Sequence, residues 1–158
     1  MSMLTKIQES QDLILGKLFE CESKIGSLYA AYGSLYPDQI DFWSHLSQEE
    51  QKHAGLLQDV REDLKKGELL RGLDHFSPSD VQKLIDFIQE KITEAEERPP
   101  SQKQAISIAL SIESSIIDTR FFEFAKSNGS SFQKAAAQLA NETQEHIRMV
   151  QKARLALK

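Results

Sequence analysis

One stretch in the first half of the chain repeats its apolar side chains at the spacing of a buried helix face. The residues of this face follow one another in alternating steps of three and four: Trp43, Leu46, Glu50, His53, Leu57, Val60 and Leu64. This is the spacing of core positions in a helix of a bundle. Two of these positions, Glu50 and His53, are not apolar, and both project from the same face because they lie three residues apart. A carboxylate and an imidazole that face a core need a partner there.

A metal ion is one partner that would satisfy both groups. An inward-facing Glu-x-x-His is the ligand pair of helical bundles that hold two metals with carboxylates. The same pattern is also common on exposed helices, where both side chains are solvated. The metal interpretation therefore depends on matching groups elsewhere in the chain.

Apolar periodicity predicts an all-α chain, because no segment alternates with period two for long. Proline, glycine and capping residues divide it into five predicted helices. The first helix begins within the first ten residues, where Thr5–Gln8 could serve as a capping box, and runs to about Gly33; the second runs from Pro37 to about Lys66. The third runs from about Ser79 to Glu97 after an N-cap at Ser77. The fourth begins with a capping pattern at Ser101–Gln104 and runs to about Ser127, before a C-cap at Asn128-Gly129, and the fifth runs from about Ser131 to near the end. The third helix has one apolar face and one acidic face, which favours a crossover helix lying on the bundle.

The two halves of the chain match each other. The stretch 46–53 aligns with 139–146, so that His53 matches His146, and Glu22 aligns with Glu113 at core positions of the first and fourth predicted helices. Thr143 takes the place of Glu50, and Arg120 takes the place of Tyr29. The repeat indicates two helical hairpins joined by a long crossover, which is the connection of ferritin-like bundles.

With these residues the chain resembles the rubrerythrin branch of the ferritin-like superfamily. The resemblance extends over nearly all of residues 1–158 as a single domain, and it implies a ferritin-like four-helix up-down bundle of two hairpins with an extra short helix in the crossover. In that family, two irons in the bundle centre react with peroxide or oxygen. The metal ligands that the resemblance implies are Glu22, Glu50, His53, Glu113 and His146.

The chain departs from the family pattern at two points. Thr143 falls where the family has a metal-bridging Glu, and it could be a neutral spacer, a hydrogen-bond donor or a sign of lost function. Glu142 is a poor substitute, because it is rotated by about 100° from Thr143 around the helix. Rubrerythrins also carry a rubredoxin-like domain with paired Cys-x-x-Cys motifs, whereas this chain has the single Cys21. Any reductant is therefore expected to be an external electron donor.

Two residues beside the ligands are candidate catalytic residues. Tyr29, seven residues after Glu22, could donate a hydrogen bond to a ligand carboxylate, or it could be a core aromatic only. Arg120 lies two predicted turns after Glu113 and could pair with Glu113 or Glu50, where it would replace the positive charge of a metal. It could equally extend outward to solvent.

Two functions are expected from these residues. The first is a non-haem oxidoreductase that reduces peroxide or oxygen, or oxidises Fe(II), with one or two ions of iron; manganese is equally suited to the donors, and zinc could be accepted. Glu50 would bridge, with Glu22 and His53 on one ion and Glu113 and His146 on the other, or the first three alone would hold a single ion. The second is a metal-free structural or interaction module, in which Arg120 replaces the metal charge. A stress or storage protein that assembles through the bundle surface is a third, weaker alternative.

Composition limits the classes of partner and the cellular location that are expected for the chain. The net charge of −5 argues against nucleic acid as a partner. No apolar run approaches the roughly 20 residues of a membrane span, and the N-terminus lacks the apolar block of a secretory signal. One cysteine excludes an internal disulfide, so a cytoplasmic location is expected. Metal ions and small oxidants are the expected partners, together with a second copy of the chain as a possible homodimer.

Overall fold

A computed structural model describes residues 2–67, 73, 76–115 and 130–157 of the chain. These residues form the helices α1 (Met3–Leu35), α2 (Ile40–Lys65), α3 (Pro78–Glu97), α4 (Gln102–Glu113) and α6 (Ser130–Ala156), with a short 3-10 turn η1 (Pro37–Gln39) before α2. No strand occurs within the described ranges, which confirms the prediction of an all-α chain for them. None of the described helices combines the length and apolar content that crossing a membrane requires.

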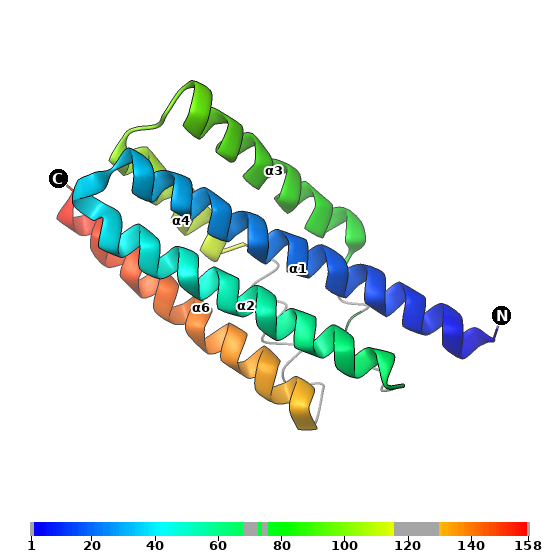
Figure 1. The fold of residues 1–158 in the computed structure, drawn as a ribbon. Coiled ribbons are helices and arrows are strands. Elements are labelled where there is room, and N and C mark those ends of the chain that lie inside the picture. The colour runs from blue at the N-terminus through cyan, green and yellow to red at the C-terminus, as the bar shows by residue number, and fades with distance from the viewer. Residues whose placement is uncertain (1, 68–72, 74–75, 116–129, 158) are drawn as a thin grey trace.

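The helices lie side by side as a bundle (Figure 1). α1 packs against α2 and α4 packs against α6, while α2 also contacts α6. α3 lies along α1, and Lys17 and Lys24 donate to Gln82 and Gln89 at 2.7 Å each. Both pairs are 65 residues apart in sequence, so α1 and α3 run in the same direction.

The crossover helix therefore brings the chain back to the end of the bundle where α2 begins. Gln102 at the start of α4 accordingly donates to Asp38 in η1 at 2.8 Å. As a result α2 and α4 run in the same direction, whereas α1 and α2 form an antiparallel hairpin (Figure 1).

The predicted buried face of α2 is confirmed. Its buried residues are Trp43, Leu46, Glu50, His53, Ala54, Leu57, Val60 and Leu64. Gly26 allows α1 and α2 to come close together one turn after Glu22. The Ser47 hydroxyl donates to the Gly26 carbonyl oxygen at 2.8 Å, and a Cβ on Gly26 would lie 3.3 Å from the Ser47 carbonyl oxygen.

The caps explain where most helices begin. Ser77 accepts the Asp80 amide at the start of α3, and Ser101 and Gln104 form a reciprocal capping box at the start of α4, as predicted. α1 begins one turn earlier than the capping box at Thr5 implied. Its N-cap is Ser2, whose hydroxyl accepts the Thr5 amide at 3.2 Å.

The fourth helix is shorter than predicted. The expected end at about Ser127 is wrong, because α4 ends at Glu113. The Ser115 amide donates to the Ile112 carbonyl at 3.1 Å, an i to i−3 bond that tightens the last turn. Consecutive serines favour such a stop because their hydroxyls compete for backbone groups. Arg120 and the predicted cap at 128–129 lie outside the described residues.

Candidate metal centre

The five predicted ligands meet in the middle of the bundle although they come from four helices. They are Glu22 on α1, Glu50 and His53 on α2, Glu113 at the end of α4, and His146 on α6. All five side chains are buried, with exposures between 0% and 5%. Polar groups buried this deeply require partners in the fold.

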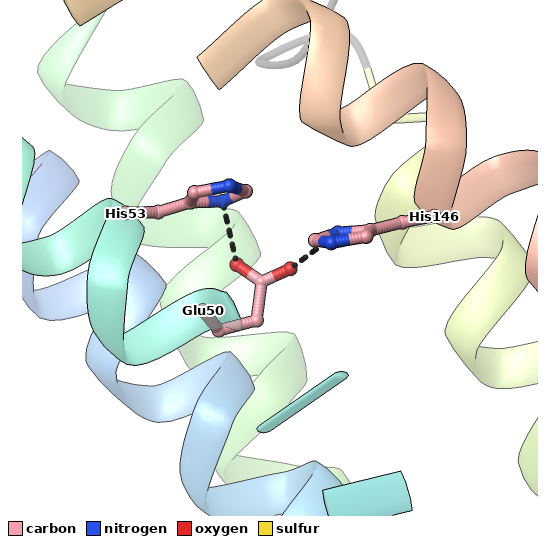
Figure 2. A group of neighbouring side chains, drawn as sticks. All are labelled: Glu50, His53 and His146. Atoms are coloured by element: carbon pink, nitrogen blue, oxygen red, sulfur yellow. Dashed lines mark ion pairs between the residues drawn. The ribbon is translucent and has the colours of Figure 1, made fainter. Parts of the chain in front are cut away.

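Glu50 lies between the two histidines (Figure 2). Its Oε2 is 3.4 Å from Nδ1 of His53, and its Oε1 is 3.2 Å from Nδ1 of His146. The two imidazole rings are stacked, with centroids 5.3 Å apart. One carboxylate therefore faces a nitrogen from each half of the chain.

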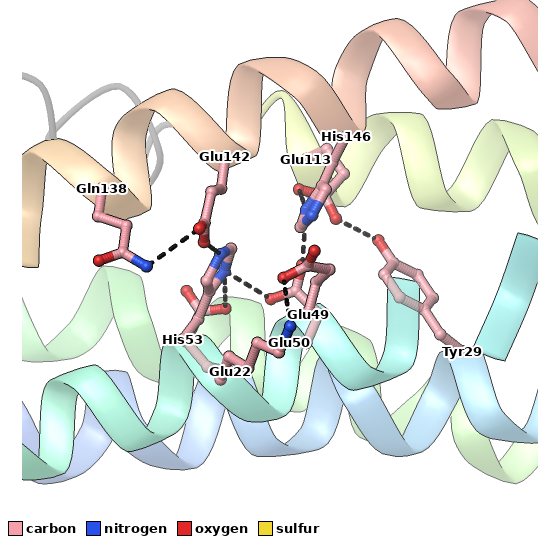
Figure 3. Close-up of polar contacts among 10 residues, drawn as sticks. Glu22, Tyr29, Glu49, Glu50, His53, Glu113, Gln138, Glu142 and His146 are labelled. Atoms are coloured by element: carbon pink, nitrogen blue, oxygen red, sulfur yellow. Dashed lines mark hydrogen bonds and ion pairs between the residues drawn. The ribbon is translucent and has the colours of Figure 1, made fainter. Parts of the chain in front are cut away.

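Each histidine also faces the glutamate of its own half. Nδ1 of His53 is 3.9 Å from Oε2 of Glu22, and Nδ1 of His146 is 3.7 Å from Oε2 of Glu113. The repeat seen in the sequence is thus present as two matching Glu–His pairs on either side of Glu50 (Figure 3).

Three atoms of this cluster are buried without a hydrogen-bond partner among the described residues. They are Oε2 of Glu50, Nδ1 of His53 and Nδ1 of His146. A buried polar atom with no partner is costly and calls for an explanation. Ligand atoms of these three residues lie within 4.8 Å of one another, so one cation between them could satisfy all three.

Glu142 contacts the cluster, and this contact was not predicted from the sequence. Its Oε2 lies 2.7 Å from Nε2 of His53, and its Oε1 accepts from Gln138 at 3.1 Å (Figure 3). A proton held on Nε2 by this carboxylate leaves Nδ1 as the nitrogen that can bind a metal. The rotation of Glu142 away from Thr143 is what directs it to the histidine of the neighbouring helix. Thr143 itself is buried, with 5% of its surface exposed.

Tyr29 also contacts a predicted ligand. Its hydroxyl donates to Oε1 of Glu113 at 2.8 Å, and the residue is 0% exposed. The predicted hydrogen bond to a ligand carboxylate is therefore present, while a catalytic role of Tyr29 stays a prediction. The predicted pairing of Arg120 with Glu113 or Glu50 falls on residues that are not described.

The charges of the cluster are strongly coupled. Burial raises the pKa of Glu50 well above its usual value, and the nearby Glu113 and Glu22 raise it further. Burial alone would lower the pKa of His53, but Glu22 and Glu50 raise it to about 11. Burial also opposes the shift at His146, whose pKa is raised by Glu113. Burial would raise the pKa of Glu22, yet contact with Glu50 and His53 holds it below its usual value.

These features define the class of the protein. Its described residues form helices and no strand, and they include a buried group of Glu50, His53 and His146 that could hold a metal ion. Comparison of the chain with protein-family models, curated proteins and solved structures found no match. The cluster itself is therefore the basis for a functional proposal.

Proposed function

We propose that this chain is a rubrerythrin-like member of the ferritin-like bundles, which binds one or two non-haem iron ions and reduces peroxide or oxygen, or oxidises Fe(II). The observation that carries the proposal is the set of three buried atoms on Glu50, His53 and His146 that have no hydrogen-bond partner among the described residues. Imidazole nitrogen with carboxylate oxygen suits iron or manganese, and zinc would also be accepted.

The described residues fit such ions. Glu50 would bridge, His53 with Glu22 would hold one ion, and His146 with Glu113 would hold the other. Because Thr143 offers no carboxylate, the second ion is held less tightly than the first. Bound iron would supply the one-electron chemistry by which peroxide or oxygen is reduced.

The protein's own groups prepare this site. Burial of the five ligands excludes bulk water. Tyr29 fixes Glu113 through its hydrogen bond, and Glu142 fixes the proton on Nε2 of His53. These contacts hold the donor atoms in place before an ion arrives.

A metal-free structural module is the second candidate, and one observation favours it. The raised pKa values of His53 and His146 allow both imidazoles to carry positive charge beside the buried glutamates. In the described part of the chain, the histidines would then take the role that the sequence suggested for Arg120.

Metal content distinguishes the two candidates. Protein purified without chelators, and then loaded anaerobically with Fe(II), is expected to contain about one or two metals per chain by elemental analysis, the count of one- and two-ion carboxylate sites. His53→Ala should lose this metal, whereas the control His45→Ala should keep it, because His45 lies exposed on the same helix. A chelator should also lower the melting temperature of the loaded protein.

The opposite result would favour the structural module. In that case the chain contains no metal after anaerobic loading, and chelator leaves the melting temperature unchanged. If metal is bound, peroxide consumption and Fe(II) oxidation by the loaded protein are the assays that follow.

A further inference from the structure

A small apolar cavity lies in the core between α1, α2 and α6. Its volume is about 10 Å³, and a cavity needs on the order of 10–15 Å³ to hold one water-sized molecule. Most of its lining comes from the three helices, through Leu15 and Leu18 on α1, Leu57 and Val60 on α2, and Ala136 and Leu139 on α6. Every lining residue is leucine, valine, alanine or phenylalanine, and no polar atom faces the cavity. The cavity therefore has room for a single small molecule and offers it no hydrogen bond.

This cavity lies next to the cluster, about one helical turn away on each of the three helices. On each helix a lining residue is three or four positions from a residue of the cluster or one in contact with it. The pairs are Leu18 and Glu22 on α1, Leu57 and His53 on α2, and Leu139 and Glu142 on α6. Because α2 runs against both α1 and α6, all three steps lead toward the same end of the bundle (Figure 1). The cavity and the cluster are thus successive layers of one core.

The lining decides which small molecule the cavity suits. Apolar cavities stay dry, because water needs hydrogen-bond partners that they do not offer. Peroxide has two hydroxyl groups, and burying them without partners is costly for the same reason. Dioxygen is apolar and has no hydrogen bond to lose when it leaves water. Of the two oxidants considered for the cluster, dioxygen is therefore the one that matches this cavity.

The position of the cavity is also informative. Protein cores are close-packed and contain few voids that are larger than a water molecule. Among the lining residues, Ala136 is 2% exposed, so its short side chain leaves this space inside the core. The space lies where an oxidant would be held before it reaches the cluster.

We propose that this cavity binds dioxygen beside the cluster, and that dioxygen rather than peroxide is the oxidant that the protein takes up. The inference rests on the proposed function, because dioxygen held one turn from the cluster is used only if the cluster binds iron. The step is binding alone, so no bond is made or broken and no proton moves in the cavity.

The test uses metal-free protein with isotope-labelled leucine and valine methyl groups. Dissolved oxygen is paramagnetic and speeds the relaxation of nearby methyl groups, so NMR spectra under oxygen pressure show where it gathers. Spectra under the same pressure of nitrogen give the baseline. The enhancement at Leu18 should exceed that at Leu28 several-fold. These two leucines of α1 are buried to the same degree, at 1% and 0% exposure, but only Leu18 lines the cavity. Equal enhancements would overturn the proposal.

Three variants locate the oxygen. Ala136→Val adds two methyl groups inside the cavity and should remove the excess relaxation at Leu18. Ala137→Val is the matched control, because it adds the same volume at a half-buried neighbour that does not line the cavity. Val60→Ala enlarges the cavity and should increase the excess, so the test does not depend on the folding of Ala136→Val. An excess that persists in Ala136→Val, or that does not grow in Val60→Ala, would place the oxygen elsewhere and overturn the proposal.

Iron-loaded protein then separates the two oxidants. In Ala136→Val, the rate of Fe(II) oxidation by oxygen should fall several-fold relative to the rate with peroxide. The same ratio of rates in Ala136→Val and Ala137→Val would overturn the assignment to dioxygen.

The two proposals can fail separately. A chain that gathers oxygen in the cavity but binds no iron would disprove the proposed function and leave the cavity as an oxygen site. A chain that binds iron but shows no excess relaxation at Leu18 would disprove the oxygen site and leave the proposed function standing.

Discussion

His53 and Glu142 meet across the contact between α2 and α6, with Nε2 of the imidazole 2.7 Å from Oε2 of the carboxylate. The opposite nitrogen, Nδ1, faces Glu50 at 3.4 Å. The imidazole is thus held from the outer side while its inner nitrogen is presented to the cluster. This arrangement assigns Glu142 a positioning role that can be measured.

Glu142→Ala is expected to weaken metal binding by about 10- to 100-fold, the usual effect of removing a carboxylate that orients a ligating histidine. Glu145→Ala is the matched control, because Glu145 lies on the same helix but is exposed and pairs with Arg148. Titration against a chromophoric chelator measures both affinities. Equal affinities for the two variants would exclude the positioning role.

Glu50→Gln is expected to change metal binding and metal-free stability in opposite directions. Metal binding should be lost with the bridging carboxylate. The metal-free protein should gain about 1–3 kcal/mol at neutral pH, because a buried group whose charged form is disfavoured has been replaced by a neutral one. Urea unfolding in the presence of chelator measures the stability of the metal-free protein, and elemental analysis without chelator measures its metal content. A variant that retains its full metal content would rule out Glu50 as a bridge.

The stability of the metal-free protein is expected to fall as the pH rises above about 6.5. His53, which faces Glu22, Glu50 and Glu142, has its pKa raised from 6.5 to about 11 in the fold. A raised pKa contributes stability that is complete below the unfolded value and is lost as the pH rises through the folded one. The raised pKa of Glu50 also makes the folded protein less stable as the pH rises, beginning at about pH 4.5, the usual pKa of the group.

Metal-loaded protein should show the opposite trend, because a metal competes with the proton on His53 and binds more tightly as the pH rises. Melting curves of both forms from about pH 6 to 9 test this difference in slope. His45→Gln, which alters an exposed histidine on the same helix, should leave both slopes unchanged. Parallel slopes for the two forms would mean that the metal does not displace a proton from the cluster.

Tyr29→Phe and Tyr32→Phe form a matched pair on one helix. Tyr29→Phe should destabilise the protein by about 1–3 kcal/mol, because it removes a buried hydrogen bond to the Glu113 carboxylate. Tyr32→Phe should be neutral or slightly stabilising, because its buried hydroxyl has no partner in the described residues. Free energies of unfolding from urea titrations compare the two. A greater loss in Tyr32→Phe would contradict the assignment of these contacts.

Thr143→Glu should restore the carboxylate that the internal repeat lacks. Thr143 is buried on the same helix face as His146, so the new side chain would reach the second half of the cluster. We expect tighter binding of a second metal, together with a metal-free protein that is less stable because it buries a further acid. Thr143→Gln is the control, because glutamine has nearly the same volume as glutamate but carries no charge. Equal second-metal affinities for Glu and Gln would show that this position does not contribute a ligand.

The inward face of each helix could be predicted from the sequence because it follows from the period of that helix alone. The three-and-four spacing from Trp43 to Leu64 places Glu50 and His53 in the core whatever the neighbouring helices do. Ser77 and Ser101 also act within three residues of the chain, so their caps were recognisable.

Features that depend on how two helices pack against each other could not be predicted from the sequence pattern. Whether Glu142 reaches His53 depends on how α6 is rotated against α2, which the internal repeat does not specify. The end of α4 at Glu113 was missed for a different reason, which is local to the sequence. The apolar spacing continues past this point in the sequence and masks the stop that the consecutive serines produce.

The division of the cluster between the two hairpins has a consequence for the order of folding. Glu22, Glu50 and His53 all belong to α1 and α2, which leave the ribosome first and whose contacts are close in sequence. Glu113 and His146 arrive later with α4 and α6. In a nascent chain, Glu22, Glu50 and His53 would therefore stay open to solvent until α4 and α6 dock over them. Metal capture during synthesis would use the first hairpin, and the last helix would act as the closing step of both the site and the fold.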